Sequence, residues 1–371
     1  MEAITMNLEQ KTLFITGKFD DNGGRESKIG NILFKGMDLT DTINCEYHNG
    51  GSFAELETIV DRVQEYNTIY WFPDITNDKV KLVKKIKEKN NACVLVTSKR
   101  NTEGKYSFAD LVHHALGNKS NLFVEITEEG GRYQGRVIDP LGNVFLDHNT
   151  DFTLVGKVVA KRANELSRYT RIGSRQIGER KNIPTDNDFF QVIKEYGETF
   201  HNLIHAHPDA VNRFFGNASF RCERGFPSFK EGNLIYVSQR NIDKRSISSD
   251  GFVALDTTIP VQYYGDRKPS VDSPIQVALY NYYPNVKYML HGHAYVQGAP
   301  FTKNVVLCGA LEEAEEIIAL FPNPETVNVA VNLKGHGSLL MVNDVRELEN
   351  IPYVARPTPD IHDDYVQRVR P

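Results

Sequence analysis

Short apolar runs alternate with segments of helical periodicity along the first half of the chain. The apolar runs are rich in β-branched and aromatic residues, which is typical of buried strands. They are residues 12–17, 68–72, 92–97 and 121–126. The segments between them repeat apolar side chains at helical spacing. These segments are residues 52–66, 77–86 and 106–116. A regular alternation of strands and helices predicts an α/β fold with a Rossmann-like, doubly wound parallel sheet.

Turn signals after the last of these runs predict an antiparallel addition to the sheet. Glu129-Gly130-Gly131-Arg132 and Pro140-Leu141-Gly142-Asn143 are typical of tight turns. We therefore expect a small antiparallel appendage over roughly residues 123–147.

The loop after the first strand, residues 17–27, is a candidate ligand site, because open α/β sheets bind ligands at the carboxyl ends of their strands. Gly23-Gly24-Arg25 offers backbone N–H groups and one cation to a phosphate, but the spacings of dinucleotide-binding and phosphate loops are missing. Two interpretations stay open: an ordinary structural turn, or a nucleotide or phosphosugar site.

Basic residues crowd into the segment that follows a helical stretch at 153–163. They are Lys161, Arg162, Arg168, Arg171, Arg175, Arg180 and Lys181. We interpret this segment as a solvated linker, with anion binding at an inter-domain cleft as the alternative. Ile183-Pro184-Thr185-Asp186 marks the junction. Two domains are therefore expected: residues 1–182, a Rossmann-like α/β domain of unknown role, and residues 183–371.

Two histidines in the second half, His291 and His293, have the spacing of metal ligands. They lie in an apolar run, residues 288–296, that predicts a buried strand. Side chains alternate along a strand, so both imidazoles point to the same face, and Gly292 leaves room between them. His336 follows between two glycines that leave its ring accessible. Three histidines with an open fourth position are typical of a catalytic metal site, whereas a His-x-His pair by itself is often accidental.

A second pair, His205 and His207, mimics the first but falls in a segment of helical pattern, residues 186–215. Residues two apart on a helix do not share a face, so we do not expect this pair to bind a metal. His201 and His205 have an i,i+4 spacing, but the glutamate of a zinc-protease helix is missing.

Composition narrows the class of protein. The 371 residues suit two domains, and 40% hydrophobic and 25% charged residues are ordinary for a globular protein. A formal charge of -5 gives no reason to expect nucleic-acid binding. We find neither a membrane-spanning apolar run nor a secretory signal, so no membrane contact is expected. The cysteines Cys45, Cys93, Cys222 and Cys308 are scattered, which predicts reduced, buried thiols in a cytoplasmic protein.

Several short motifs follow one another in a recognisable order in the second half. They are Gly216-Asn217-Ala218-Ser219-Phe220-Arg221, Ser238-Gln239, Pro269-Ser270-Val271-Asp272, His291-Gly292-His293 and His336-Gly337. In this order, and in the interval from Asp272 to His291, the chain resembles the class II aldolase/adducin family over roughly residues 186–350. The resemblance is to its L-fuculose-1-phosphate aldolase-like members.

This resemblance implies a class II aldolase-like α/β/α domain over residues 183–371, usually assembled as a homotetramer. It implies a divalent metal, most commonly Zn²⁺, on His291, His293 and His336. The catalytic glutamate of the family aligns with Asp272. The substrate or phosphate contacts align with Gly216, Asn217, Ser238, Gln239 and Ser270.

The implied activity is that of a metal-dependent lyase, an aldolase that cleaves or forms a carbon–carbon bond in a sugar phosphate or a related small hydroxy-ketone. Cleavage generates an enediolate whose charge a divalent metal stabilises, and a carboxylate nearby, here Asp272, moves the proton. Asp272 would also be the N-cap of the helix that follows. The alternatives are a pentulose-phosphate 4-epimerase or a sugar-phosphate dehydratase on the same site, or a non-catalytic adducin-like binding module.

Three positions depart from the family pattern. Asp272 replaces a glutamate and shortens the reach of the carboxylate by one methylene. Gln239 stands where the family has a glycine, and Val271 replaces a serine. We expect a weaker anion site, or a substrate other than a phosphate monoester, with Arg240 and Lys268 as flanking cations that could compensate.

Overall fold

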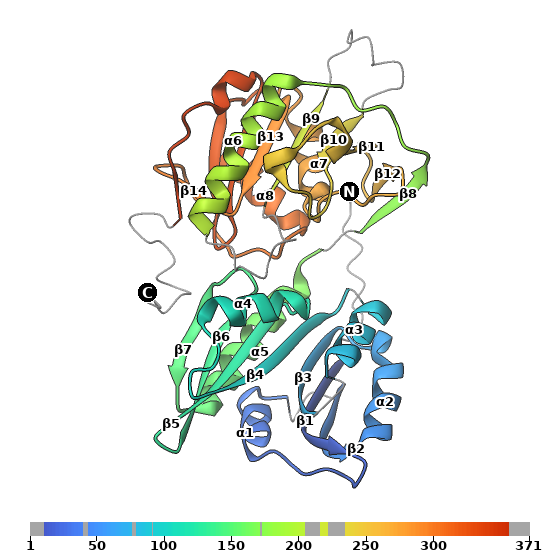
Figure 1. Ribbon diagram of the computed structural model, residues 1–371, viewed down its shortest axis with the longest axis vertical. Helices are drawn as coiled ribbons and strands as arrows, with labels where there is room; N and C mark the ends of the chain where they lie inside the picture. Colours follow the sequence, from blue (N-terminus) through green and yellow to red (C-terminus); the bar gives the residue numbers. More distant parts are fainter. Residues whose placement is uncertain are drawn as a thin grey trace. The chain divides into compact units, whose positions relative to one another are not determined.

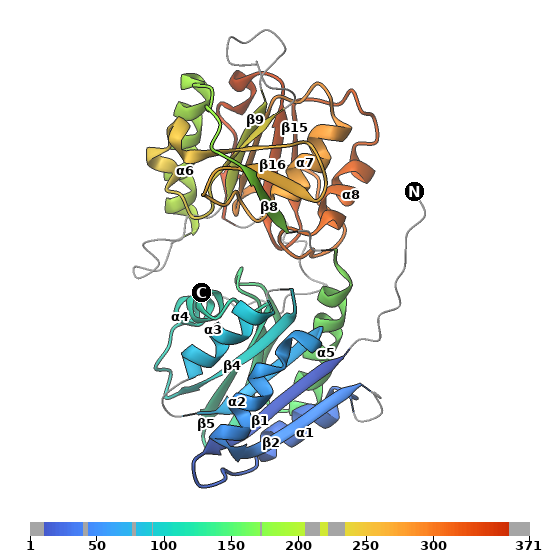
Figure 2. The same cartoon turned by 90° about the vertical axis from the view of Figure 1, so that its right-hand side faces the viewer.

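The computed structural model describes residues 11–39, 44–75, 79–90, 92–170, 173–204, 216–221 and 234–355. Within these ranges the chain forms two compact units, of which the first ends at Arg168 and the second begins at Tyr169. Each unit has a sheet and a hydrophobic core of its own (Figures 1 and 2).

The first unit contains a seven-stranded sheet in the order β2-β1-β3-β4-β5-β6-β7. Its strands are β1 (Thr12–Asp20), β2 (Cys45–Ser52), β3 (Thr68–Asp74), β4 (Val94–Thr102), β5 (Leu122–Glu129), β6 (Arg132–Ile138) and β7 (Val144–Asn149). The first five strands in this order are parallel, and β6 and β7 continue the sheet in antiparallel pairing. The predicted Rossmann-like sheet and its antiparallel appendage are confirmed.

Helices cover both faces of this sheet. They are α1 (Lys28–Gly36), α2 (Phe53–Asp61), α3 (Lys79–Lys89), α4 (Phe108–Gly117) and α5 (Phe152–Arg168). Leu13 and Ile15 of β1 pack with α2 and α3 on one face. Phe14 points the other way and meets Phe34 of α1, with ring centroids 5.1 Å apart. Burial on both faces explains why β1 has a continuous apolar run and not an alternating one.

The strand order reverses direction at β1, so the loop of residues 21–27 lies at the point where such sheets bind ligands. The loop ends at Ser27, whose hydroxyl caps α1 by accepting a hydrogen bond from Gly30 N at 3.0 Å. Both interpretations of this loop, a structural turn and a nucleotide or phosphosugar site, stay open.

The second unit contains an eight-stranded sheet in the order β15-β16-β13-β9-β10-β11-β12-β8. Its strands are β8 (Ser174–Gly178), β9 (Asn217–Arg221), β10 (Ile235–Ser238), β11 (Phe252–Leu255), β12 (Val261–Tyr264), β13 (Tyr288–Gly292), β15 (Val329–Leu333) and β16 (Gly337–Val342). All neighbouring strands pair antiparallel except β12 and β8, which are parallel. β14 (Tyr295–Val296) and β17 (Tyr353–Val354) form a separate pair.

Helices cover both faces of this sheet too, which gives the α/β/α layers that the family resemblance implies. On one face α7 (Ser273–Tyr282) and α8 (Leu311–Leu320) share a core with Met289. On the other face α6 (Asn187–Ile204) shares a core with Leu290. Neighbouring residues of β13 thus enter two different cores, so this strand is buried on both sides.

Parts of the basic segment that we interpreted as a solvated linker form regular secondary structure. Its first part belongs to α5, where the buried Arg162 guanidinium lies over the ring of Phe145. Residues 174–178 form β8, which pairs with β12 at the edge of the second sheet. Most of β8 is exposed, so its polar composition resembles that of a linker. The boundary between the two units lies between Arg168 and Tyr169, whereas we expected it between residues 182 and 183.

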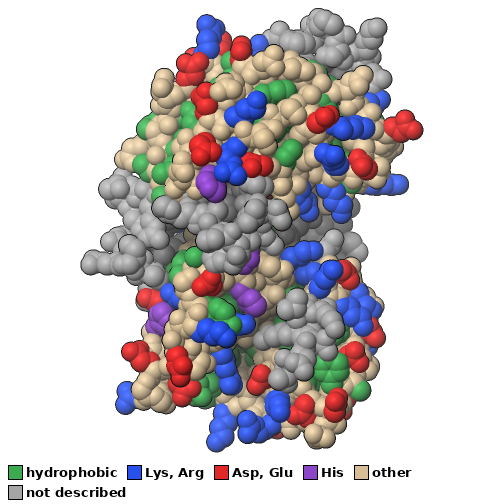
Figure 3. Space-filling model, in the orientation of Figure 1, with side chains coloured by type: hydrophobic (Ala, Val, Ile, Leu, Met, Phe, Trp, Pro, Cys, Tyr) green, Lys and Arg blue, Asp and Glu red, His purple; other side chains and the backbone are tan. Residues whose placement is uncertain are grey.

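The surface is of mixed charge. On the face shown in Figure 3, Lys and Arg side chains lie among Asp and Glu side chains over both units. None of the helices within the described ranges combines the length and the apolar composition needed to cross a membrane.

Candidate metal centre

His291 and His293 come from the end of β13, in the middle of the second sheet. β13 pairs with β16 on one side and β9 on the other, and this pairing buries His291 to 3% exposure. His293 lies just past the strand. The centroids of the two rings lie 5.2 Å apart, so both side chains lie on the same side, as the spacing of two along a strand predicts.

His336 reaches the same place from the turn between β15 and β16. Gly337 follows it with a φ of 135°, and a Cβ atom there would lie only 2.1 Å from the carbonyl oxygen of Gly292. A glycine is needed at 337 because the turn packs directly on the end of β13. The ring of His336 lies 4.7 Å from that of His291 and 5.1 Å from that of His293. One ligand atom from each of the three histidines lies within 4.8 Å of the others.

Hydrogen bonds orient two of these rings. Nδ1 of His291 lies 2.9 Å from the carbonyl oxygen of Ser338, which can only accept, so Nδ1 carries the proton. Nε2 of His291 is then left with a lone pair, and it is buried without a hydrogen-bond partner. Nδ1 of His336 lies 2.9 Å from Oε1 of Glu313, a buried residue in the first turn of α8. A carboxylate behind a histidine is a common support for a metal ligand.

The ionisation of the three rings differs. Burial, together with the charge of His336, lowers the pKa of His291 to about 4. Burial also lowers the pKa of His293 well below its usual value. Both rings are therefore neutral near pH 7, which is the form that binds metals. Burial acts against the charge of His336 as well, but Cys308 and Glu313 beside it hold its pKa well above the usual value. A cation must displace that proton.

These donors fit a divalent metal. Imidazole nitrogens are preferred ligands of Zn²⁺, and the buried Nε2 of His291 has no other partner.

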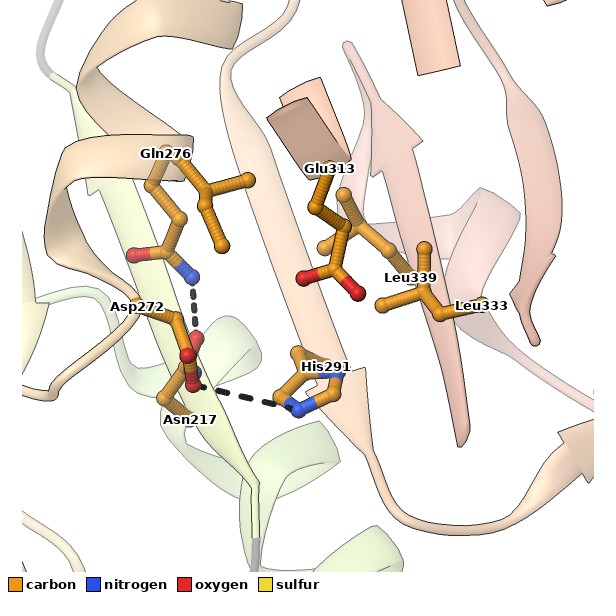
Figure 4. A pocket seen from close by; sticks show the side chains of 8 residues that line it. Asn217, Asp272, Gln276, His291, Glu313, Leu333 and Leu339 are labelled. Carbon is orange, nitrogen blue, oxygen red and sulfur yellow. Dashed lines mark hydrogen bonds and ion pairs between the residues drawn. The ribbon is translucent and has the colours of Figure 1, made fainter. Parts of the chain in front are cut away.

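Asp272 lies beside the histidines, at the N-cap position of α7. We expected its side chain to cap this helix, but it forms no capping hydrogen bond. Its Oδ2 instead accepts a hydrogen bond from Asn217 Nδ2 at 3.0 Å and lies 4.0 Å from Nε2 of His291 (Figure 4). Its Oδ1 is buried without a partner. The carboxylate is therefore turned away from its own helix and toward the histidines.

A small pocket opens between these groups. Figure 4 shows Asp272, Asn217, Gln276, His291 and Glu313 around it. Its remaining lining is apolar and comprises Ile275, Leu333 and Leu339. Gln276 donates a hydrogen bond to Asn217 Oδ1, and its own Oε1 is buried without a partner. The residues that line this pocket thus include three buried polar atoms without a hydrogen-bond partner: Asp272 Oδ1, Gln276 Oε1 and His291 Nε2.

The remaining residues expected to contact substrate lie close together at the end of β10. Ser270 N donates to Ser238 O at 3.2 Å, and Gln239 forms a β-bridge with Pro269. The Ser238 hydroxyl accepts from Ala218 N at 3.1 Å. Gly216 precedes β9 and lies against the backbone of His291.

The side chain of Gln239 makes two hydrogen bonds within the protein. Its Nε2 donates to the carbonyl oxygen of Asp250, and its Oε1 accepts from Arg267 Nη1 at 3.1 Å. The side chain that replaces the glycine of the family is thus held by its neighbours and positions Arg267.

Sequence reasoning missed four polar residues in or near the centre. They are Gln276, Glu313, Cys308 and Lys244. Gln276 and Glu313 could have been found from the sequence, because each is a polar residue among apolar ones on the buried side of a helix. Lys244 is 3% exposed, and burial lowers its pKa to about 8 while Asp243 and Asp272 act in the opposite direction.

Two other expectations concern residues outside this centre. The pair His205 and His207 lies outside the described residues, and His201 is exposed on α6. The described cysteines Cys45, Cys93 and Cys308 are in no disulfide bond, and of these three Cys93 is buried.

Residues 199–299 match the family model described as the class II aldolase and adducin N-terminal domain. The match includes Asp272, His291 and His293 and ends before Cys308 and His336. It confirms the resemblance of the second half of the chain to this family. No curated protein matches the chain.

Solved structures resemble parts of the chain. A DNA/pantothenate metabolism flavoprotein from Streptococcus pneumoniae is 9% identical, with 42% of this chain and 99% of that chain covered and a TM-score of 0.34. An L-fuculose 1-phosphate aldolase is 18% identical, with 45% of this chain and 84% of that chain covered and a TM-score of 0.31. The N-terminal class II aldolase domain of a conserved protein from Thermoplasma acidophilum is 15% identical, with 44% and 85% covered and a TM-score of 0.29.

Proposed function

We propose that the second unit is a metal-dependent lyase that cleaves or forms a carbon–carbon bond in a sugar phosphate or a related small hydroxy-ketone. The observation that carries this proposal is the convergence of His291, His293 and His336 beside a carboxylate, Asp272, that lacks a structural task on its own helix.

The three histidines would hold the metal, for which Zn²⁺ is the best candidate. When bound, a divalent metal acts as a Lewis acid toward the carbonyl and hydroxyl oxygens of a substrate and stabilises the negative charge that develops as the bond breaks. The chain contributes the orientation of the ligands: Ser338 O fixes the ring of His291, and Glu313 fixes that of His336.

Asp272 would move the proton on the carbon that becomes negatively charged. Asn217 holds Oδ2 of this carboxylate, and Gln276 in turn holds Asn217, so Oδ1 is left to face a substrate. We assign Asn217 a double role: it positions Asp272, and it belongs to the substrate contacts that the family resemblance implies.

The anion of the substrate would bind where the ends of β10 and the segment before Asp272 meet. Ser238, Gln239 and Ser270 lie together there, and Gln239 presents Arg267. The Gln239 amide already donates to Asp250 O, so it contributes less to anion binding. The Ser238 hydroxyl only accepts from Ala218 N and keeps its O–H to donate, and Arg267 would supply the charge that pairs with the anion.

The first experiment is a measurement of bound metal in the purified protein. Wild type is compared with His291→Ala/His293→Ala and with His201→Ala as a control, because His201 is exposed on α6. We expect about one equivalent of metal per chain in wild type and control, and none in the double variant. No metal in any of them, even after incubation with zinc, manganese or cobalt, would contradict the lyase and leave the adducin-like binding module.

Product analysis then identifies the reaction. Ketose phosphates and unphosphorylated hydroxy-ketones are offered in parallel, and an aldehyde product that requires the metal indicates retro-aldol cleavage. An epimer or a dehydrated product instead indicates the 4-epimerase or the dehydratase, which would use the same residues.

A homotetramer is expected from the family resemblance, and light scattering after gel filtration measures it directly. The cytoplasmic location expected from the scattered cysteines stays a prediction, which fractionation of cells that express the protein would test.

A further inference from the structure

Cys308 lies within the metal centre, although its sequence context does not mark it. Its Sγ atom is 3.3 Å from Nε2 of His336. Together with Asp272 and His336 it forms a second group whose potential ligand atoms all lie within 4.8 Å of one another. His336 belongs to this group and to the group of three histidines.

The local fold holds Cys308 in place. It lies in a turn before α8, in which Ala310 N donates to Leu307 O at 3.0 Å. Gly309 has a φ of +77°, and a Cβ atom there would lie 2.8 Å from the carbonyl oxygen of Val271. Without a side chain at 309, the turn packs directly on the segment that leads to Asp272.

Distances distinguish the thiol from the carboxylate as a ligand. A sulfur at about 2.3 Å and a nitrogen at about 2.0 Å from one tetrahedral Zn²⁺ lie roughly 3.5 Å apart. The 3.3 Å between Cys308 Sγ and His336 Nε2 is close to this value. A carboxylate oxygen and a nitrogen on the same ion would lie about 3.3 Å apart, whereas Asp272 Oδ2 is 4.0 Å from His291 Nε2. The thiol thus lies at ligand spacing from His336, whereas the Asp272 carboxylate lies farther than ligand spacing from His291.

We propose that Cys308 is a thiolate ligand of the metal, so that three histidines and one cysteine surround the ion in the substrate-free protein. The proposal rests on the metal centre of the proposed function and deepens it. Asp272 then stays outside the ligand set, where a group that transfers protons is needed. A Zn²⁺ site with four ligands can expand to five, which leaves one position for a substrate oxygen.

Coordination by Cys308 replaces its S–H bond by a sulfur–metal bond, and the proton passes to solvent with no change in oxidation state. A thiolate favours Zn²⁺ and Co²⁺ over Mg²⁺ and Mn²⁺, because hard cations prefer oxygen ligands. With Cys308 as a ligand, the centre is therefore expected to bind Zn²⁺ or Co²⁺ more tightly than Mg²⁺ or Mn²⁺.

The test uses the full-length protein loaded with Co²⁺ or with Zn²⁺. Absorption of the Co²⁺ form in the near ultraviolet detects a thiolate-to-cobalt charge-transfer band, and X-ray absorption of the Zn²⁺ form measures the ligand distances. Cys308→Ser is compared with Cys45→Ser, a half-buried thiol of β2 in the first unit. Circular dichroism checks that both variants fold.

Wild type and Cys45→Ser are expected to show the band and one sulfur at about 2.3 Å, and Cys308→Ser neither. We also expect Zn²⁺ affinity in Cys308→Ser to fall about a hundredfold or more, since even supporting residues behind ligands are worth 10–100-fold. One bound metal without a sulfur signal in wild type would overturn the inference and leave the lyase intact. A wild-type protein that takes up neither metal would overturn both.

Discussion

Asp272 occupies a helix N-cap position but does not cap its helix. An aspartate at this position usually accepts a hydrogen bond from the backbone of the first turn. Here Asn217 holds the carboxylate away from α7, and its Oδ1 is buried without any partner. Burying a carboxylate oxygen without a hydrogen-bond partner costs free energy of folding. We therefore infer that a bound group interacts with Oδ1 when the site is filled.

Replacing Asp272 by asparagine tests its role in proton transfer. Asp272→Asn keeps the size of the side chain but removes its basic group, so we expect kcat to fall about 10²–10⁴-fold while the metal stays bound. Asp266→Asn, at an exposed position, serves as a control. Steady-state kinetics and metal analysis measure both quantities. A loss of metal in Asp272→Asn would instead identify this residue as a ligand.

Glu313 is the residue that supports His336. Glu313→Gln can still accept the hydrogen bond from Nδ1 but lacks the charge, so we expect metal affinity to fall about 10–100-fold. Competition with a chromophoric chelator measures the affinity. Glu315→Gln, an exposed position on the same helix, is the matched control and should bind metal like wild type. Equal affinities in the two variants would show that Glu313 only fills space.

The centre is assembled at the level of elements by two tight turns, one of which packs on the end of β13 and the other on the segment before Asp272. The turn between β15 and β16 brings in His336, the turn before α8 brings in Cys308, and the first turn of α8 brings in Glu313. Each turn contains a glycine whose missing side chain permits the approach. The distances between ligands therefore depend on backbone packing and not on long, adaptable side chains.

Replacing Gly337 by alanine tests this dependence. The new Cβ would meet the carbonyl oxygen of Gly292, so we expect a loss of stability and a displaced His336 with weaker metal binding. Gly298→Ala separates strain from collision, because Gly298 also has a positive φ of 79° but no atom lies within 4 Å of its Cβ position. Strain alone costs about 1–3 kcal/mol. Thermal denaturation should show a larger loss for Gly337→Ala, and equal losses would contradict the packing argument.

At the scale of the whole molecule, the two units of the described chain have separate cores, which are built from different sheets. The core around Leu13 and Trp71 belongs to the first unit, and the core around Met289 and Met341 to the second. All members of the metal centre lie in the second unit. We therefore propose that the second unit folds and binds metal by itself.

Two fragments test this proposal and the position of the boundary. A fragment of residues 169–371 keeps β8, whereas one of residues 183–371 exposes the edge of β12 that β8 covers. We expect the longer fragment to bind metal like the full-length protein and the shorter one to be less stable and more prone to aggregate. Chemical denaturation and gel filtration measure this. Equal behaviour of both fragments would show that β8 contributes little.

Much of the fold was predictable because local pattern and burial agree. The apolar runs at 12–17 and 68–72 became β1 and β3, which are buried on both faces. The edge strands β2 and β8 were missed, since an edge strand is held by backbone pairing to one neighbour and can be polar throughout. The pattern of their side chains therefore does not predict this pairing.

The sequence by itself determined the pairing of His291 and His293, because alternation along a strand places both on one face whatever the surroundings are. It also supported His336 and Asp272 through the order of motifs. Only the tertiary structure decided that Cys308 and Glu313 contact His336, and that Asn217 turns Asp272 away from its helix. These contacts join segments far apart in the chain. Their geometry depends on how closely one turn packs on β13 and the other on the segment before Asp272, and no local sequence pattern predicts this packing.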